Sequence, residues 1–553
     1  MEETDISRVS SCRGVAFEAK AYRNYIFDVS ASTRKEHHQS ERWIRPAWTE
    51  KISAFKVFPG SNSLRRSLGI SSRHFCDLEV DEDENKDYNL SMYLEDASPQ
   101  DLENNQHLAG KVNPYKQLPK PALKKDRLSV ILRDQGLFTV YKRLFIVSLL
   151  LNIIGLALAA TDYFTYGRRK PAVFSIGNIL ALTLCRNEAF LRCVFWLAVK
   201  LFGRAWIPLW IKTLTTSFLQ SLGGIHSGCG VSSIIWLLYA IILTIQHREK
   251  SSLLIISVAF AILFLILLSS LAAFPLVRHL HHNVFERIHR FAGWLALVLV
   301  WLFVVLTLSY EPSSKLYDFS LFEYVKALEL WLTLVITCLI ILPWLTVKRV
   351  QVRVSSPSGH ASIIKFEGGV KAGLLGRISP SPFSEWHAFG IISDGKDEHM
   401  MLAGAVGDFT TSLVSNPPTH LWIRTLHFAG LPYLVSLYKK VVLVATGSGI
   451  CVFLSFLMQP SSTEVCLVWV AKGVEQNFGT EITKYVSGFP KDKVIVHDTG
   501  VLGRPNVAEM SVDAAKKWKA EVVIVTSNPE GSRDVVHACK ASGIPAFGPI
   551  WDS

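Results

Sequence analysis

A glycine turn that follows a run of β-branched residues is the stretch of this sequence with the clearest chemical meaning. The run Val441–Cys451 reads VVLVATGSGIC, which predicts a strand, a turn and the start of a helix. In such an arrangement backbone N–H groups and the helix N-terminus can bind a pyrophosphate. Gly447 permits a tight turn, and Gly449 lets a phosphate approach without meeting a Cβ atom. A single G-x-G is a weak signal, so the surrounding elements must decide its meaning.

Two histidines in apolar surroundings form the second candidate site. His226 and His289 each stand near the start of a long apolar run, and an ionisable residue inside a membrane segment is a functional candidate by default. Two histidines at one depth on neighbouring helices can ligate a haem iron from its two sides. The alternative is that both merely form hydrogen bonds between helices. Glycines near them would leave room for a flat macrocycle: Gly223, Gly224, Gly228, Gly230 and Gly293.

The elements that must hold these histidines are apolar helices. The chain has 553 residues, of which 49% are hydrophobic, and these concentrate between about 143 and 347. A membrane helix needs about 20 such residues. The pattern predicts six spans, and it predicts an interfacial amphipathic helix with a loop over 189–223, where basic residues interrupt the apolar ones. The predicted spans are 143–161, 172–184, 228–245, 252–275, 288–308 and 324–346.

Charge and cysteine content narrow the class of protein. The net charge of +12 comes from Lys and Arg that cluster beside the apolar runs, as expected for cytosolic flanks of membrane helices. We therefore expect no nucleic-acid partner, an integral membrane protein with both termini in the cytosol, and residence in the plasma membrane or an endomembrane. The nine cysteines contain no C-x-x-C pair, which disfavours structural zinc and a disulfide scaffold. The acidic first residues predict no cleavable signal peptide.

Composition divides the chain into four parts. Residues 1–125 are polar and predict a disordered cytosolic N-terminal tail. Residues 135–347 form the predicted transmembrane helical bundle, and 348–438 show short alternating runs typical of an antiparallel β-barrel. Residues 439–553 predict an α/β domain with parallel strands. Its strands are expected at 441–446, 465–470, 493–497 and 522–526.

In this order of parts the sequence resembles the ferric reductase and NADPH oxidase superfamily. It looks closest to the fungal and plant ferric-reductase-like integral membrane flavoproteins related to the membrane part of adenylate-forming fusion proteins. The resemblance covers about 135–553, and it implies a six-helix bundle, an FAD-type barrel and a ferredoxin-reductase-like NAD(P)-binding domain. Its motifs include Arg186-Asn187-Glu188, GGIHSGCG at 223–230, FERIHRFAGW at 285–294, EWHAF at 385–389, GDFT at 407–410 and Gly503-Arg504-Pro505.

The resemblance implies a role for individual residues of the soluble half. FAD would contact His387 and Phe389 in the barrel, and its diphosphate would contact Gly407 and Thr410. The dinucleotide would lie along Gly447 and Gly449. Further implied contacts are a ribose 2′-phosphate with Lys472 and Arg504, which favours NADPH over NADH, and a flavin stacked on Trp551. The alternatives are a β-turn with a core aromatic ring at Phe409 for the segment 407–410, solvated basic residues, and a Trp551 that only closes the last strand.

Several residues depart from the superfamily pattern, and each departure removes a group that the pattern assigns to haem binding, flavin binding or hydride transfer. The second histidine of each haem-binding helix is missing, since Tyr239 or Ala240 and Leu302 or Phe303 stand there, so at most one inner-leaflet haem b fits. The flavin motif has lost its Pro and its hydroxyl, because the sequence reads His387-Ala388-Phe389-Gly390. Ser527 replaces the thiol of the hydride site.

These features predict an integral membrane flavoprotein oxidoreductase that transfers electrons from NAD(P)H to FAD and onward to one haem. The competing hypothesis is a catalytically weak or inactive membrane sensor or scaffold that retains the reductase fold. Expected partners are membrane lipid, a dinucleotide, and an adenylate-forming enzyme or another redox partner. Catalytic residues and the electron acceptor are not indicated by the sequence.

Overall fold

A computed structural model describes residues 8–11, 15–18, 139–274, 277 and 282–550. Strands β1 (Arg8–Ser11) and β2 (Val15–Glu18) form an antiparallel hairpin in one compact unit, and residues 139–550 belong to a second unit that contains all sites discussed below. The rest of the predicted tail lies outside the described residues, and so does Trp551.

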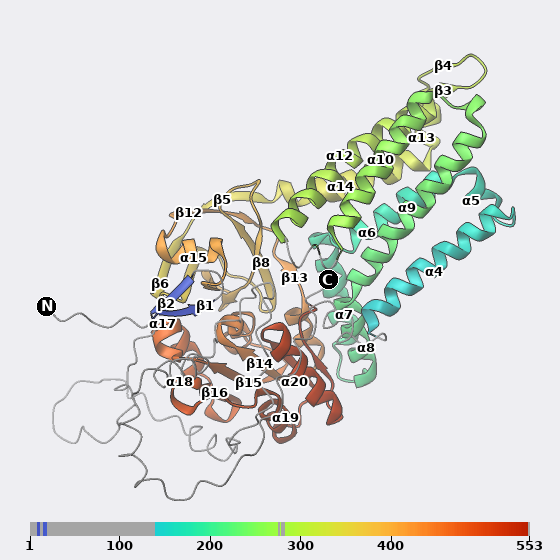
Figure 1. The fold of residues 1–553 in the computed structure, drawn as a ribbon. Helices are drawn as coiled ribbons and strands as arrows, with labels where there is room; N and C mark the ends of the chain where they lie inside the picture. The colour runs from blue at the N-terminus through green and yellow to red at the C-terminus, as the bar shows by residue number, and fades with distance from the viewer. Residues whose placement is uncertain (1–7, 12–14, 19–138, 275–276, 278–281, 551–553) are drawn as a thin grey trace, which may run out of the picture. The chain divides into compact units, whose positions relative to one another are not determined.

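Apolar helices make up the first half of the second unit (Figure 1). Five of the helices in the described part of the chain are long and apolar enough to cross a membrane. They are α4 (Val140–Ala160), α9 (Leu222–Gln246), α10 (Leu253–Ala272), α12 (His282–Ser309) and α14 (Leu328–Leu345). The predicted second span, 172–184, corresponds to α6 (Pro171–Leu184), which has 14 residues and is shorter than these five; Lys170 separates it from α5 (Thr165–Arg169). The loop after α12 holds β3 (Tyr310–Glu311), β4 (Leu316–Tyr317) and the short helix α13 (Leu321–Lys326).

Close backbone contact explains why α9 starts six residues earlier than the sequence predicted. A Cβ atom on Gly224 would lie 2.2 Å from the carbonyl oxygen of Tyr141, and one on Gly228 would lie 2.9 Å from that of Phe145. Small residues spaced by four let membrane helices approach closely. Tertiary packing against α4 therefore outweighs the poor helix propensity of glycine.

Two shorter helices connect α6 with α9. These are α7 (Glu188–Phe202) and α8 (Leu209–Gln220), and one face of each packs on the sheet-containing half of the unit. Helix α7 contacts β13 (Phe428–Ala429) and the 3₁₀ helix η4 (Leu431–Leu437), and α8 also contacts η4. The amphipathic pattern predicted for 189–223 is therefore present in the structure.

Residues 347–429 form two antiparallel sheets rather than one continuous ladder. The first has the order β10-β11-β7-β6, and the second has the order β13-β8-β12-β5 with β9 paired to β8. The prediction of a barrel is met only in part, because the hydrogen bonds divide the strands between two sheets. The strands are β5 (Val347–Gln351), β6 (Arg353–Ser358), β7 (Ala361–Glu367), β8 (Leu374–Ser379), β9 (His387–Gly390), β10 (Ile392–Ser393), β11 (Glu398–Gly404) and β12 (His420–Arg424), with helix α15 (Asp408–Ser415) before β12.

The last part is a five-stranded parallel sheet with the order β16-β15-β14-β17-β18. Its strands are almost fully buried on both faces, as parallel sheets covered by helices are. Alternate residues of β14 therefore face two different cores: Leu443 joins the core shared with the antiparallel sheets, and Val444 joins the core under the last helices. The elements are β14 (Lys440–Thr446), β15 (Glu464–Ala471), α17 (Val474–Ser487), β16 (Val494–Asp498), α19 (Val507–Trp518), β17 (Val522–Thr526), α20 (Pro529–Ala541) and β18 (Ala546–Phe547).

Candidate functional site

The strand order creates a switch point beside the predicted glycine turn. From β14 the chain moves to β15 and β16 on one side, and it then returns to β17 on the other side. Ligands of doubly wound sheets bind at the carboxyl ends of the strands where the order reverses. Thr446 is the last residue of β14, and Ser527 is the first residue after β17. Their hydroxyl oxygens lie 2.8 Å apart at that edge. The sheet thus places Gly447 and Gly449 at its ligand-binding edge.

The structure requires glycine at positions 447 and 449 for two different reasons. Gly447 adopts φ +51°, a Cβ atom there would meet nothing within 4 Å, and its carbonyl accepts a hydrogen bond of 2.9 Å from the Trp469 indole. The tight turn expected at Gly447 is therefore present, with open space beside it. At Gly449, in contrast, a Cβ atom would lie 2.9 Å from the carbonyl oxygen of Thr526. Gly449 packs against the end of β17, which the sequence could not reveal.

The helix expected after the turn is replaced by a shorter element. Gly447–Val452 forms the 3₁₀ helix η5, and α16 (Leu454–Met458) adds only five residues. The cause is burial, since Ile450, Phe453 and Leu454 are all fully buried and the segment cannot keep a solvent face. The backbone of η5, rather than the end of a long helix, therefore faces the switch point.

The ends of β15 and β16 hold the predicted cations. Lys472 follows β15, and Arg504 follows Gly503, whose carbonyl oxygen lies 2.8 Å from the Nε2 atom of the buried His497. Asp498 accepts hydrogen bonds from the amides of Gly473 and Val474, at 2.8 and 2.9 Å, and also from that of Gly500. The amides at the start of α17 are therefore already occupied by a carboxylate. Sequence reasoning missed both His497 and Asp498.

The flavin motif lies on β9. The His387 ring stacks on Phe409 with 4.4 Å between ring centroids and 10° between ring planes. Phe389, predicted to present its ring to FAD, instead belongs to the buried core. The partly exposed pair of His387 and Phe409 is the flat surface that remains at this strand.

The end of β9 brings the two predicted cofactor sites together. A Cβ atom on Gly390 would lie 2.7 Å from the amide nitrogen of Val452 and 2.8 Å from the Sγ atom of Cys451. No side chain fits between β9 and η5. This contact leaves no room for a hydroxyl-bearing side chain at 390, and it sets the predicted flavin strand directly against the predicted dinucleotide turn.

The GDFT segment begins α15. The Thr410 hydroxyl accepts hydrogen bonds from the amides of Val406 and Gly407 at 3.1 and 3.0 Å, and it donates one to the Gly407 carbonyl oxygen at 3.1 Å, which caps the helix internally. The predicted diphosphate donor is therefore committed to its own turn. The exposed residues there are Gly407 and Asp408.

The histidine pair is held in place by its neighbours. The rings of His226 and His289 lie 6.3 Å apart between centroids, at an angle of 52°. The Nδ1 atom of His226 lies 3.0 Å from the Leu182 carbonyl oxygen, and that of His289 lies 2.8 Å from the Ser269 hydroxyl. An N–H on Nδ1 of His226 must donate to that carbonyl, which leaves Nε2 as the nitrogen able to bind a metal.

Open space lies one helical turn beyond each histidine. Gly230 follows His226 by four residues, Gly293 follows His289 by four residues, and a Cβ atom at either glycine would meet nothing within 4 Å. The structure therefore has open space at these two of the five glycines named above. Gly224 and Gly228 instead serve the contact with α4.

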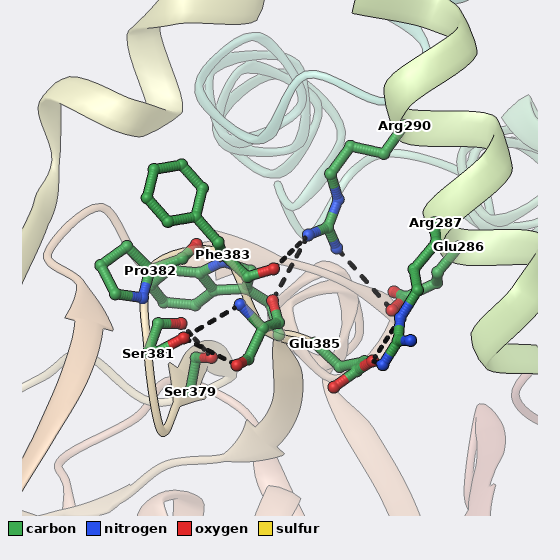
Figure 2. A network of polar contacts seen from close by, with 10 residues as sticks. Glu286, Arg287, Arg290, Ser379, Ser381, Pro382, Phe383 and Glu385 are labelled. Atoms are coloured by element: carbon green, nitrogen blue, oxygen red, sulfur yellow. Dashed lines mark hydrogen bonds and ion pairs between the residues drawn. The ribbon is translucent and has the colours of Figure 1, made fainter.

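A polar network joins α12 to the connection between β8 and β9 (Figure 2). Arg287 pairs with Glu385 at 2.9 Å, and Arg290 donates to the carbonyl oxygens of Phe383 and Ser384, each at 3.4 Å. Glu385 has its pKa held below its ordinary value by its own backbone amide and then by Arg287. The helix that carries His289 is thereby attached to the segment that leads into His387.

The Arg186-Asn187-Glu188 motif forms a second junction. Asn187 caps α7 and donates to the Leu339 carbonyl oxygen of α14 at 2.7 Å. Glu188 is buried and pairs with Arg377 of β8 and with Arg424 of β12. Burial lowers the pKa of Arg424, and Glu188 acts in the opposite direction. The sequence showed the motif but not these partners.

The second half of the chain is a two-part module: a parallel sheet with a topological switch point, set against antiparallel sheets. The family model for "Adenylate-forming reductase 03009, C-terminal domain" matches residues 431–553. Two curated proteins from Coprinopsis cinerea are each 31% identical: adenylate-forming reductase 03009, which aligns over 79% of this chain and 42% of the relative, and adenylate-forming reductase 06235, over 76% and 41%. The chain spans less than half the length of these relatives.

Solved structures with partial similarity include a phthalate dioxygenase reductase, with 13% identity, a TM-score of 0.30, and coverage of 36% of this chain and 68% of the other. A ferredoxin-NADP⁺ reductase from Plasmodium falciparum has 12% identity and a TM-score of 0.27, and it covers 36% of this chain and 93% of the other. The relatives by sequence are adenylate-forming reductases, which agrees with the last part of the predicted resemblance. The wider resemblance to ferric reductases and NADPH oxidases stays a prediction.

Proposed function

We propose that this chain is a membrane-embedded oxidoreductase that passes electrons from NADPH to FAD and then to one haem held between His226 and His289. The observation that carries the proposal is the contact of Gly390 on β9 with Cys451 and Val452 of η5. It supports the proposal because a hydride can move only between cofactors in contact, and this contact sets the two cofactor motifs side by side. The names of the relatives, both reductases, support the same class of reaction.

At the dinucleotide site, residues of the chain would bind and orient NADPH. The open space beside Gly447 admits a pyrophosphate against the backbone of η5. Lys472 and Arg504 follow neighbouring strands, and their charges favour a ribose 2′-phosphate. Because Asp498 fills the amides at the start of α17, selection of NADPH would depend on these two cations.

At the flavin end, the stacked rings of His387 and Phe409 offer a flat surface, and the backbone at Gly407 and Asp408 is open to a diphosphate. Bound FAD supplies a group that accepts two electrons and releases them singly. The chain's role is to hold that group against the dinucleotide and to exclude water, for which the tight contact at Gly390 is suited.

The two histidines are the residues that would hold a haem iron. Their ring centroids lie 6.3 Å apart, and each ring would offer its Nε2 atom to the metal. Both Nδ1 atoms have hydrogen-bond partners, which is how proteins orient metal-binding histidines. A bound haem would supply a one-electron carrier, with Gly230 and Gly293 lining its faces.

Purified chain in detergent tests this proposal by its absorption spectrum. We expect flavin and haem bands, and we expect the haem band to disappear in His226→Ala and in His289→Ala. Gly230→Leu and Gly293→Leu should also remove haem, because each fills the open slot. Gly177→Leu is the matched control: a Cβ atom at Gly177 also meets nothing within 4 Å, and this glycine lies on α6. A haem band that survives both histidine substitutions would refute the ligand assignment.

The dinucleotide site has a separate test. Gly447→Asp places a carboxylate where the pyrophosphate would lie, and it strains a backbone with φ +51°. NADPH should then fail to reduce a flavin that is still bound. Unchanged reduction would remove Gly447 from the site.

We also propose an integral membrane location for the chain, with both termini cytosolic, and an adenylate-forming enzyme as the partner that supplies the substrate. The five long apolar helices and the names of the relatives support this. Retention of the chain in the membrane pellet after alkaline extraction tests the location. Release into the supernatant would contradict it.

A scaffold without turnover is the second candidate function. The specific observations in its favour are the internal use of the Thr410 hydroxyl and the occupation of the α17 amides by Asp498. A folded but colourless preparation that binds no flavin would support this alternative over the first.

A further inference from the structure

One face of each of the two short helices α7 and α8 packs against the rest of the fold. Phe195 and Ala198 of α7 and Leu219 of α8 are buried in the core shared with the sheets. Polar contacts support the same face: the Thr216 hydroxyl lies 2.7 Å from that of Tyr438, and Arg192 donates to the His427 carbonyl oxygen at 3.2 Å. These faces hold the helices on the sheet-containing half of the unit.

The opposite faces are apolar and exposed. On α7 they consist of residues spaced by seven and four, and on α8 of residues spaced by four, so each set forms one stripe along its helix. The exposed stripe residues are Phe190, Leu197 and Leu201 on α7, and Trp210, Leu214 and Phe218 on α8. Trp206 between the helices is 72% exposed and Trp210 is 66% exposed, although large aromatic rings normally find cover in a folded protein.

The segment 189–221, which holds most of α7 and all of α8 and is called the hairpin below, carries only positive charges. Residues 189–221 contain no Asp or Glu, and they contain four basic residues. Lys200 and Arg204 are exposed, and the Lys200 ammonium lies 4.9 Å from the centre of the Trp196 ring. Tryptophan with neighbouring Lys and Arg on an amphipathic helix is the composition of segments that lie in the headgroup region of a bilayer with anionic lipid.

The chain places the hairpin at the ends of apolar helices. Helix α6 ends at Leu184 just before α7, and α8 ends at Gln220 just before α9 begins. Helices α4 and α9 start side by side, since Gly224 meets Tyr141 (Figure 1). The hairpin therefore leads directly into α9, one of the helices that are long enough to span a membrane.

We infer that the exposed faces of α7 and α8 lie on the surface of an anionic bilayer and hold the sheet-containing half of the chain at a fixed depth. The inference shares the membrane location with the proposed function, but it needs no flavin, haem or dinucleotide. A lipid surface suits these faces better than a second copy of the chain, because every charge on 189–221 is positive and two copies would repel each other.

Environment-sensitive labels on the full-length chain in nanodiscs test this. Cys12, Cys76, the partly exposed Cys185 and the exposed Cys193 and Cys338 are first replaced by Ser. Single cysteines at Leu197 and Leu214 then carry a nitrobenzoxadiazole dye, in discs of phosphatidylcholine with phosphatidylserine. A label at Glu398, an exposed residue of β11, is the solvent control, and a label at Leu295, an exposed residue of α12, is the bilayer control.

The expected result is blue-shifted emission at 197 and 214, with quenching by headgroup-labelled spin lipid at least twofold stronger than at 398. Replacement of phosphatidylserine by phosphatidylcholine should reduce that quenching, as should Lys200→Glu with Arg204→Glu. Emission at 197 and 214 that matches the solvent control would overturn the inference. Blue-shifted emission without lipid quenching would also overturn it, since protein would then cover the faces. Emission at 295 that matches the solvent control would remove the membrane location itself, and with it the proposed function.

Discussion

Arg287 on α12 and Glu385 in the β8–β9 connection form an ion pair with 2.9 Å between Nη2 and Oε1 (Figure 2). Arg287 stands two residues before His289, and Glu385 stands two residues before His387. This pair therefore ties together the two histidines that the proposed function places at the haem and at the flavin. Its strength is open to direct measurement.

Charge reversal tests the attachment of α12 to the β8–β9 connection. Arg287→Glu and Glu385→Arg alone should speed amide hydrogen exchange over residues 381–386 by up to about fivefold, since an exposed pair contributes about 1 kcal/mol or less. The double variant should restore slow exchange. The same reversal at Arg353 and Glu398, an exposed pair of 2.7 Å elsewhere, is the control and should leave 381–386 unchanged. Equal exchange in all variants would show that the pair does not hold this connection.

Loss of the Glu188 carboxylate should be far more costly. Glu188→Gln leaves Arg377 and Arg424 without their shared counter-charge in a buried place, and a broken buried pair typically costs about 3–5 kcal/mol. Thermal unfolding in detergent measures the loss. Glu481→Gln, which breaks the more exposed pair with Lys365, should lower the melting temperature much less. Similar shifts in the two variants would mean that Glu188 is not the junction described above.

Restoring the family hydroxyl should harm this chain. Gly390→Ser puts a Cβ atom within 2.7 Å of the Val452 amide nitrogen, so overpacking should cost about 1–3 kcal/mol and weaken flavin retention. Gly359→Ser is the control, because a Cβ atom there meets nothing within 4 Å. Thermal melting and flavin content give the answer, and a Gly390→Ser variant as stable as the parent would contradict the close contact.

Mild acid should destabilise the antiparallel sheets. Burial, with smaller effects of His399 and Arg192, lowers the pKa of His427 from 6.5 to about 4. Between pH 6.5 and about 4, His427 is therefore protonated in the unfolded chain and neutral in the folded chain. Stability is unaffected above pH 6.5, and it falls as the pH drops from 6.5 to 4, by about 3 kcal/mol at most. Melting temperatures between about pH 7.5 and 4.5 should fall less steeply in His427→Gln, whereas the exposed His420→Gln should follow the parent. Parallel curves for all three would rule out His427 as the cause.

The parallel strands were the most predictable elements. The run expected at 522–526 coincides with β17, and the one at 465–470 lies within β15, which extends one residue further at each end. Buried β-branched runs mark such strands with little ambiguity. The apolar helices were predicted almost as well, but α9 begins at Leu222 because a neighbouring backbone, invisible in the local sequence, stabilises its glycines.

Roles that depend on distant contacts could not be predicted. Gly390 resembled a damaged flavin motif until the approach of Val452 supplied a packing reason, and Gly449 resembled a phosphate contact until Thr526 supplied another. Glu188 meets arginines 189 and 236 residues further along the chain. The histidine pair was predictable because the cost of polar groups in apolar helices singles them out, whereas Asp498 and His497 look like ordinary loop and strand residues.

The contact of α9 with α4 has a mechanical consequence. At Gly224 and Gly228 the backbone of α9 lies against the backbone of α4, and only the small side chain of Ser148 also borders the contact. The two helices should therefore move as one rigid unit. His226 lies on α9, so it cannot shift without moving both helices. Any opening that admits a macrocycle between the two histidines must come from movement of α10 and α12 on the other side.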